Sequence, residues 1–596
     1  MTKFIILYNN TYNNNNLNTI YLKMKSLKLA SGLTLTFLFA LVYALVFVIS
    51  IWFLPGAWWS LLIMIGFTIG IILMQYGISP YIIQWVYKID WIPYDEYKRQ
   101  YPHLAETLEK VVNVNDMDMP RLGIIRDLNP NAFTFGHTKN NARVVLTEGI
   151  LKFLDEEEQQ AVLAHELGHV IHRDFILMTI VFAIPMIFLT IARWAYYSSL
   201  FRRIGRDEEG GYMYLVMIAI AFLSFLCYYI GYFLSLVISR IREYYADEHA
   251  AEVLENPNAL STGLVKIAYG LINSQEKSIE ERNKSKVRAV KGLGIFDPNS
   301  AQSFAVASMG PRGTYSKEAI QAAAAWDLYN PWAKYYQLYS SHPLPAKRIQ
   351  RLNEQCEKYN IQPEIDFSDA ERIKEEQAGK SMKGEFLTDL FFKNLPTLIL
   401  LGFIIFSIIW LFDIIGFYSL PFVSGLGVSQ LMFLWAVCFY LIAFGFIART
   451  LFRYRSGFKP YNVVDLLTRV KASPIRCIPA VIEGKIIGKG VPGYYISDDL
   501  YFQDETGILY VDYRFGLSIV DFFWAIRRAS EMVGQTVRIK GWYRRGPMPY
   551  IQVKELETMG GKTYKNHTKG LSYVWAALAF LIGVGIFVFW LFLFVL

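Results

Sequence analysis

The sequence predicts a polytopic α-helical membrane protein that carries an α+β domain and a C-terminal β-barrel domain outside the bilayer. Three observations lead to this fold class. The chain has 596 residues and is 54% hydrophobic, which is too apolar for a wholly water-soluble protein of this length. The apolar residues concentrate in long windows, and the segments between them have ordinary polar content. The last long polar segment has a strand-rich pattern of its own.

The windows predict seven membrane spans, because a run of roughly 18 or more apolar residues can cross a bilayer as a helix. They are 33–54, 59–77, 175–197, 212–238, 396–418, 428–448 and 572–595. The first six form three hairpins, at 31–77, 175–238 and 394–448, and the final span stands alone at 571–596. We therefore expect a multi-pass protein of the cell membrane.

Basic residues flank most of these hairpins, for example at Lys23, Lys88 and Arg449. By the positive-inside rule this pattern places the N-terminus and all long polar segments in the cytoplasm. One short loop disagrees, because residues 198–211 carry three arginines and lie outside if the hairpin reading holds.

The spans separate two domains. Residues 78–174 and 239–393 are expected to form one discontinuous α+β domain, and residues 449–570 a second domain. The first 30 residues read as a low-complexity leader with a run of asparagines, and Met24 looks like a more natural start than Met1.

The α+β domain shows strand and helix signals in its first half. "PRLGIIRD", "NAFTFG" and "ARVVLT" read as short strands, the last two joined by the turn "HTKNN". Thr147 is expected to cap a short helix, "EGILKFL". Asp155 and Glu158 have the spacing of a capping box, so a longer helix should begin there and run toward the membrane.

The second domain has the element order strand, hairpin, helix, strand, strand. "IRCIPAVIEGKII" is followed by a hairpin with "DETG" as its turn, the helical "LSIVDFFWAIRRASEM", and the strands "TVRIKGWYRR" and "PYIQVKELE". This order resembles the five-stranded OB-fold barrel. A small barrel on a membrane protein is more often an interaction or regulatory module than a nucleic-acid binder.

Composition argues against two further classes of site. Cys227 and Cys438 fall inside spans while Cys356 and Cys477 are isolated, so neither a disulfide framework nor a paired-cysteine metal site is expected. The formal net charge of +8 comes from basic residues that flank the spans and form no single stripe. Nucleic acid is therefore not an expected partner.

The stretch "AHELGHVIHRD", residues 164–174, carries the chemistry. Residues four apart share one face of a helix, so His165 and His169 can present imidazole nitrogens to one metal ion. Zinc held in this way keeps a position for water, and the Glu166 carboxylate can accept the proton of that water. A catalytic zinc site needs a third protein ligand, and Glu243 and Asp247 share a face of a helix that follows the fourth span.

Four motifs taken together resemble the HtpX-type membrane zinc metalloproteases, relatives of the CAAX prenyl proteases. They are "HELGHVIHRD", "SRIREYYADEHAAE", "NAFTFG" and "SSHPLPAKRI", with a membrane hairpin between the first two, and the resemblance covers roughly residues 24–352. It implies a zincin-like fold for the α+β domain. It also implies one zinc ion per chain on His165, His169 and Glu243, with Glu166 as general base.

The resemblance implies further roles. Asp247 corresponds to a carboxylate that orients a ligating imidazole. His342 and Arg348 match positions near the active site, where His342 could stabilise an oxyanion. Asn131, Ala132 and Phe133 match an edge strand that binds an extended peptide as an added strand. Asp174 matches as well, with only a local structural role assigned to it.

These features predict an integral-membrane zinc endopeptidase whose partners are the bilayer and membrane-associated or misfolded membrane proteins. Two alternatives remain open: processing of lipidated C-terminal motifs, as in the CAAX relatives, and a non-enzymatic membrane scaffold that acts through the OB-like domain. Intact Glu166 argues against the scaffold.

Overall fold

The structure, a computed structural model, describes most of the chain in two compact units. The described residues are 58–87, 89–202, 208–273, 317–378, 382–414, 423, 425–489, 500–513 and 532–595. The first unit comprises residues 1–302 and 335–366, and the second comprises 303–334 and 367–596. The predicted leader and the first predicted span, 33–54, lie outside the described residues.

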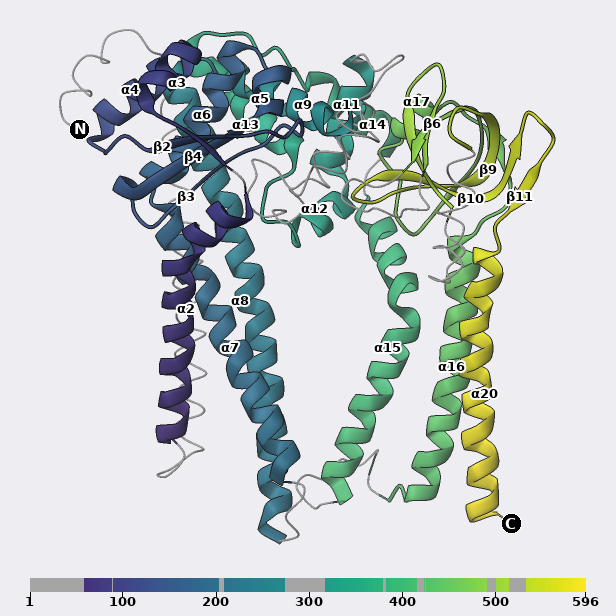
Figure 1. The fold of residues 1–596 in the computed structure, drawn as a ribbon. Helices are drawn as coiled ribbons and strands as arrows, with labels where there is room; N and C mark the ends of the chain where they lie inside the picture. The colour runs from purple at the N-terminus through teal and green to yellow at the C-terminus, as the bar shows by residue number, and fades with distance from the viewer. Residues whose placement is uncertain are drawn as a thin grey trace. The chain divides into compact units, whose positions relative to one another are not determined.

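Six described helices are long and apolar enough to cross a membrane (Figure 1). They are α2 (Trp58–Val86), α7 (Asp174–Arg202), α8 (Glu208–Leu254), α15 (Lys383–Ile414), α16 (Val428–Arg453) and α20 (Thr568–Phe594). They confirm the predicted multi-pass architecture for the last six of the seven windows. Helix α8 is 47 residues long, so the fourth span and the charged segment after it form one continuous helix.

The first unit contains a four-stranded sheet in the order β1-β2-β4-β3. The strands are β1 (Asp90–Ile92), β2 (Arg121–Ile125), β3 (Ala132–Gly136) and β4 (Ala142–Thr147). Strands β2 and β4 are parallel, and the other neighbours are antiparallel. Phe133, Phe135 and Val145 pack with Ile125 and Tyr87 in a core on one face of the sheet. Strand β3 is therefore an edge strand whose aromatic side chains are already buried.

The remaining elements of this unit are mostly short helices. They are α3 (Tyr94–Gln100), α4 (Pro102–Asn115), η1 (Lys139–Asn141), α5 (Glu148–Phe153), α6 (Glu156–Ile171), α9 (Pro257–Asn273), α13 (Pro345–Cys356) and η4 (Glu357–Tyr359). The predicted capping box of α6 is confirmed, since Asp155 and Glu158 each accept the other's backbone N–H at 3.0 Å. Lys266 of α9 contacts both carboxylates, at 2.9 and 2.6 Å, and ties α9 to the start of α6.

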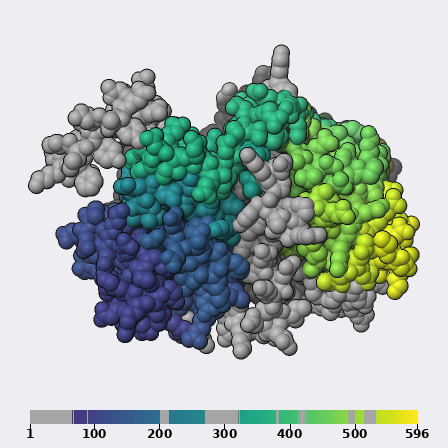
Figure 2. Space-filling view, turned by 90° about the horizontal axis from the view of Figure 1, so that it is seen from above, coloured from purple at the N-terminus to yellow at the C-terminus, as the bar shows by residue number. Residues whose placement is uncertain are grey.

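The second unit contains a closed five-stranded barrel, in which every strand has two neighbours. The strands are β6 (Ile478–Lys489), β7 (Leu500–Gln503), β8 (Ile508–Asp512), β9 (Thr536–Arg545) and β10 (Pro549–Thr558), paired in the ring order β6-β7-β8-β10-β9. Within this ring, only the β8–β10 pairing is parallel. The two short strands β5 (Lys459–Pro460) and β11 (Thr563–Lys565) extend the sheet at β6 and β10. Seen from above, the described barrel residues, green to yellow, form one compact body (Figure 2).

The turn predicted at "DETG" is present between β7 and β8, where Asp504 Oδ1 accepts the backbone N–H groups of Thr506 and Gly507 at 2.7 and 2.9 Å. The helix expected between the third and fourth strands, around 517–532, falls almost wholly outside the described residues.

A segment from the middle of the chain packs on the barrel's own unit. Helix α11 (Lys317–Tyr329) and the start of α12 (Pro331–Gln337) belong to the second unit, with α14 (Ser368–Ala378) and α17 (Val463–Leu467). Trp326 donates its indole N–H to the Ala472 carbonyl at 3.0 Å, and the Arg545 guanidinium lies 4.6 Å from the Trp326 ring centroid. Asn330 donates to the carbonyls of Val470 and Ala472 at 2.6 and 3.2 Å. No pattern in the sequence predicts this packing.

Substitution of Asn330 by leucine should destabilise the second unit. The change leaves the buried Val470 carbonyl without this donor, while the Ala472 carbonyl keeps the Trp326 indole N–H, and an unsatisfied buried polar group costs about 1–3 kcal/mol. The measurement is the thermal unfolding midpoint in detergent, with the exposed Lys334→Ala of α12 as control. Equal midpoints for the two variants would contradict the importance of these hydrogen bonds.

Candidate metal centre

The candidate site lies where helix α6 crosses helix α8. His165, Glu166 and His169 are on α6, and Glu243 and Asp247 are on α8. Gly168 permits the close approach, since a Cβ atom at this position would lie 3.1 Å from the Cα of Ala246 and 3.2 Å from the Cβ of His249. Any larger residue between the two histidines would push the helices apart.

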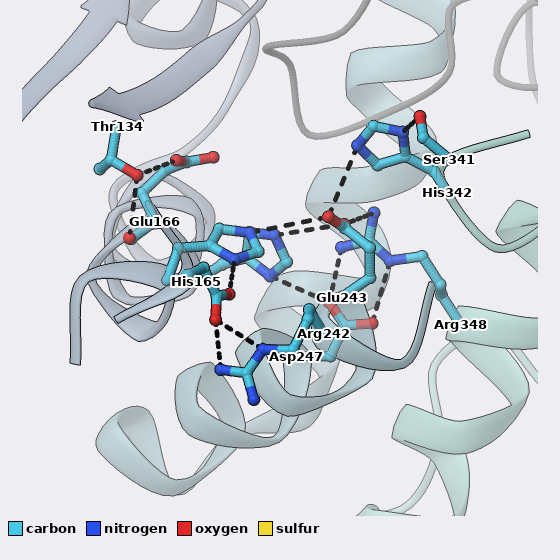
Figure 3. A network of polar contacts seen from close by, with 11 residues as sticks. Thr134, His165, Glu166, Arg242, Glu243, Asp247, Ser341, His342 and Arg348 are labelled. Atoms are coloured by element: carbon cyan, nitrogen blue, oxygen red, sulfur yellow. Dashed lines mark hydrogen bonds and ion pairs between the residues drawn. The ribbon is translucent and has the colours of Figure 1, made fainter. Parts of the chain in front are cut away.

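His165, His169 and Glu243 form the one group of three ligand-type side chains, among the described residues, that could hold a metal ion. Their ligand atoms all lie within 4.8 Å of one another. Nε2 of His165 and Nε2 of His169 each lie 3.7 Å from a different oxygen of the Glu243 carboxylate. Figure 3 shows His165 and Glu243 pointing toward each other from the two helices.

The donor set fits a divalent cation. His165 is fully buried, and neither its Nε2 nor the Oε2 of Glu243 has a hydrogen-bond partner. Buried polar atoms without a partner are costly, so their convergence on one point calls for a ligand there. Two imidazoles and one carboxylate make up a known set of three protein ligands for catalytic zinc.

Asp247 contacts the ring nitrogen of His165 that does not face Glu243, and so orients the imidazole. Its Oδ1 lies 3.0 Å from Nδ1 of His165, which leaves Nε2 directed at Glu243. Arg348 in turn holds Asp247 through Nε at 2.9 Å and a second nitrogen at 2.5 Å, and it is fully buried. Another nitrogen of the same guanidinium lies 3.5 Å from Glu243. The two residues that the sequence assigned to supporting roles thus meet at the site (Figure 3).

Asp174 orients His169 in the same way that Asp247 orients His165. This role of Asp174 was not predicted from the sequence. Its Oδ2 lies 2.8 Å from Nδ1 of His169, while Oδ1 accepts from Nε of Arg242 at 2.5 Å. Each histidine therefore contacts a carboxylate, and each carboxylate is held by an arginine. The one feature of the sequence that points to this contact is the position of Asp174, five residues after His169 and at the start of α7.

The two histidines differ in protonation. Burial lowers the pKa of His165 to about 4, so its imidazole is neutral. Burial acts in the same direction on His169, but the hydrogen bond to Asp174 and the charge of Glu243 outweigh it and raise the pKa to about 9. A bound cation would displace that proton, because imidazoles ligate metals in their neutral form.

Glu166 projects from α6 toward strand β3. Burial raises the pKa of Glu166 to about 7, with the His169 charge acting against the rise. Its carboxylate accepts a hydrogen bond from the Thr134 hydroxyl at 3.3 Å. Thr134 lies in β3 (Figure 3), so the candidate base and the edge strand are neighbours.

The residues of the predicted substrate strand make contacts within the protein. The Asn131 backbone N–H donates to the Thr147 hydroxyl at 2.9 Å, and Ala132 is fully buried. The Phe133 ring centroid lies 5.5 Å from that of Tyr87. Any peptide bound here would contact the main chain of β3, because the side chains of Ala132 and Phe133 are buried.

His342 reaches the site from the segment before α13. Its Nε2 lies 3.5 Å from Oε1 of Glu243, and Ser341 Oγ lies 2.9 Å from its Nδ1 (Figure 3). The residue is 6% exposed. The structure therefore brings together every predicted site residue on α6, α8 and the segment 342–348, with β3 beside them.

Comparison with known proteins gives consistent results. Residues 98–356 match Peptidase family M48. The "Protease HtpX homolog" of Methanothermobacter thermautotrophicus is 37% identical over 251 residues, which are 42% of this chain and 89% of that protein. The chain belongs to the HtpX proteases of peptidase family M48. The protein is accordingly a membrane metalloprotease, and the resemblance found in the sequence is confirmed.

Further relatives carry the same name. The "Protease HtpX homolog" of Pyrococcus furiosus is 29% identical over 42% of this chain and 72% of its own length, and that of Aquifex aeolicus is 35% identical over 33% and 63%. A crystal structure of S. mikatae Ste24p covers 56% of this chain and 67% of that chain at 16% identity. Its TM-score is 0.29, too low to establish a common fold.

The metal content of two variants should separate Glu243 from Asp247. Glu243→Gln keeps the size of the side chain but loses a charged ligand, and we expect purified protein with little bound metal and no activity. Asp247→Asn should retain metal supplied in excess, because loss of a partner behind a ligand typically costs only about 10- to 100-fold in affinity.

Metal per chain is measured by mass spectrometry of the digested protein. Glu252→Ala, an exposed position on the same helix, is the control and should load fully. Greater metal loss in Asp247→Asn than in Glu243→Gln would move the third ligand to Asp247.

Asp174→Asn should resemble Asp247→Asn. The two carboxylates make equivalent contacts to the two histidines, so each change should weaken metal affinity by a similar factor, about 10- to 100-fold. Competition with a chromophoric chelator measures this affinity. Unaltered affinity in Asp174→Asn would reduce Asp174 to a structural role in the start of α7.

Proposed function

We propose that the protein is a zinc-dependent endopeptidase with one zinc ion per chain, held by His165, His169 and Glu243. The observation that carries the proposal is the convergence of two imidazole nitrogens and one carboxylate within 4.8 Å, beside the buried carboxylate of Glu166. Zinc bound there would supply Lewis acidity toward water and toward the carbonyl of a peptide bond.

Glu166 acts as the general base and then as the acid. A carboxylate with a pKa raised to about 7 by burial can accept a proton from water and return it to the leaving amine near neutral pH. The Thr134 hydroxyl holds the carboxylate toward β3. The proton is therefore exchanged close to where a strand-bound substrate lies.

Strand β3 receives the substrate as an extended peptide. Its outer edge has no neighbour among the described strands, and β-strand addition gives main-chain affinity with little sequence selectivity. His342 donates toward the substrate carbonyl oxygen as negative charge develops on it, since its Nε2 is within reach of the ligand Glu243.

The substrates are membrane-associated or misfolded membrane proteins. Glu243 lies on a helix that continues into a membrane span, and Asp174, which contacts His169, is the first residue of another such helix. The site therefore stands within a few helical turns of the bilayer, where tails and unfolded segments of membrane proteins emerge. The basic flanks of most spans support a cytoplasmic position for the protease domain and the barrel.

The barrel is an OB-like interaction module. Numbered from β6 to β10, its ring order is 1-2-3-5-4, closed by pairing of the first and fourth strands, and its third and fifth strands are parallel. This connectivity supports the OB-like assignment made from the element order. The domain boundaries expected from the sequence, 78–174 with 239–393 and 449–570, are part of the proposal. Within 239–393, the described segments 317–334 and 367–378 pack in the unit that holds the barrel.

Substitution Glu166→Gln tests the chemistry separately from metal binding. The change removes the base and leaves the three ligands, so zinc should remain near one per chain while peptide hydrolysis falls by about 100- to 10,000-fold, the usual contribution of general acid–base catalysis. Initial rates on an unfolded model substrate measure the loss. Substantial turnover in a preparation free of other proteases would remove Glu166 from the mechanism.

A second experiment separates the endopeptidase from the CAAX alternative. Purified full-length protein in detergent should degrade an unfolded membrane-protein substrate faster than a prenylated peptide of matched length, because β3 selects main chain and contributes no lipid contact. A metal chelator should abolish both rates, and added zinc should restore them. Preference for the prenylated peptide would favour the alternative.

A further inference from the structure

Cationic and aromatic side chains gather at a surface near the end of helix α16. They take no part in the proposed zinc site. We call this surface the basic–aromatic patch. It comprises Arg453, Tyr454, Arg455, Phe458, Lys540, Trp542, Arg544 and Lys554, all of the second unit. Arg453 is the last residue of α16, the next three residues of the patch lie in the segment that follows it, and the others lie on strands β9 and β10.

Three aromatic rings bind the chain that leaves α16 to the barrel. The Trp542 ring lies 4.8 Å from Tyr454 and 5.9 Å from Phe458, and its indole N–H donates to the Arg455 carbonyl at 2.9 Å. Tyr454 and Trp542 are buried, while Phe458 is partly exposed. These contacts fix the positions of the aromatic rings in the patch.

Cations lie over two of these rings, those of Tyr454 and Phe458. The ammonium groups of Lys540 and Lys554 lie 5.2 and 4.8 Å from the centroid of Phe458, and the guanidinium of Arg544 lies 5.1 Å from that of Tyr454. Arg453 lies 5.6 Å from the same Tyr454 ring. Lys554 and Arg455 are exposed and Lys540 is partly so, which leaves the positive charge accessible.

No carboxylate neutralises this charge among the described residues. The five cations of the patch form no ion pair there, whereas Arg538, two residues before Lys540 on β9, pairs with Glu483 at 3.0 Å. Arg544 is fully buried and donates to the backbone carbonyls of Ile475 and Arg453, at 2.6 and 2.8 Å, while its Nε has no partner. An uncompensated cluster of this kind attracts anions.

The chain itself fixes the level of the patch relative to the membrane. Arg453 is the last residue of α16, and the neighbouring helix α20 begins at Thr568, both being candidate spans. Phe458, with the two lysines over it, follows Arg453 by only five residues. Figure 1 shows the barrel directly at the ends of these two helices. The patch therefore stands at the boundary between bilayer and water.

We propose that the basic–aromatic patch binds the headgroups of anionic phospholipids in the bilayer that α16 and α20 cross. Lysine and arginine at this level attract lipid phosphates, and aromatic rings favour the headgroup region. Binding holds the barrel at a fixed height on the membrane. Nucleic acid fits less well, because OB-folds bind it mainly on the second and third strands, here β7 and β8, and the patch lies on β9 and β10.

The test is lipid binding by the full-length protein in a neutral detergent, followed by its thermal unfolding midpoint as lipid is added. Dioctanoyl phosphatidylglycerol should raise the midpoint saturably, and dioctanoyl phosphatidylcholine should not. The double variant Lys540→Gln/Lys554→Gln should bind phosphatidylglycerol roughly tenfold or more weakly, since each lysine near an anionic surface contributes on the order of fivefold in affinity.

The matched control is Lys485→Gln/Lys562→Gln, which removes the same charge from exposed positions on the same barrel, whereas the lysines over Phe458 are Lys540 and Lys554. It should bind phosphatidylglycerol like the unaltered protein. If the first double variant does not purify, Lys554→Gln alone, at an exposed position, replaces it. Equal affinity in both double variants would overturn the proposal. So would an equal response to phosphatidylcholine, or displacement of the lipid by inorganic phosphate or oligothymidylate at similar concentration.

Discussion

The candidate metal site depends on the burial of Glu243 against two imidazoles where α6 crosses α8. Four carboxylates are buried in this small volume, those of Glu166, Asp174, Glu243 and Asp247, and among the described residues two guanidiniums, those of Arg242 and Arg348, pair with them. Two negative charges remain when the histidines are neutral. Such an excess is expensive inside a protein unless a cation or protons balance it. A divalent ion balances it fully, and otherwise His169 and Glu166 hold protons, as their raised pKa values of about 9 and 7 indicate.

This balance explains why the site is assembled from distant parts of the chain. Arg348 comes from α13, Asp174 from the start of α7, and Arg242 from α8, next to the ligand Glu243. Each carboxylate that contacts a histidine is fixed by an arginine, so neither imidazole can turn without losing its contact to a fixed carboxylate. Because α7 and α8 are also the membrane hairpin, a shift between these helices would reach His169 through Asp174. The position of the candidate metal ligands is therefore coupled to the packing of α7 against α8.

Much of this arrangement could be predicted from the sequence. Apolar windows located the spans, the Asp155 and Glu158 spacing located the start of α6, and strand patterns located β2, β3 and β4. These signals are local, because periodicity and capping depend on neighbouring residues. The contact of Asp174 to His169 spans only five positions, but its contact to Arg242 spans 68 positions and depends on how two helices pack, so the sequence could not predict it. The packing of Trp326 and Asn330 on the barrel unit is equally non-local and leaves no periodic trace.

X-ray absorption at the zinc edge tests the central claim most directly. The sample is the Glu166→Gln protein loaded with zinc, which cannot digest itself but keeps the three ligands. We expect two imidazole nitrogens at about 2.0–2.1 Å and carboxylate and water oxygens at about 2.0–2.2 Å, with no sulfur. The imidazole signal should disappear when Glu243→Gln is added and zinc is lost. A sulfur shell at about 2.3 Å, a single imidazole, or an unchanged spectrum in the double variant would contradict the site described here.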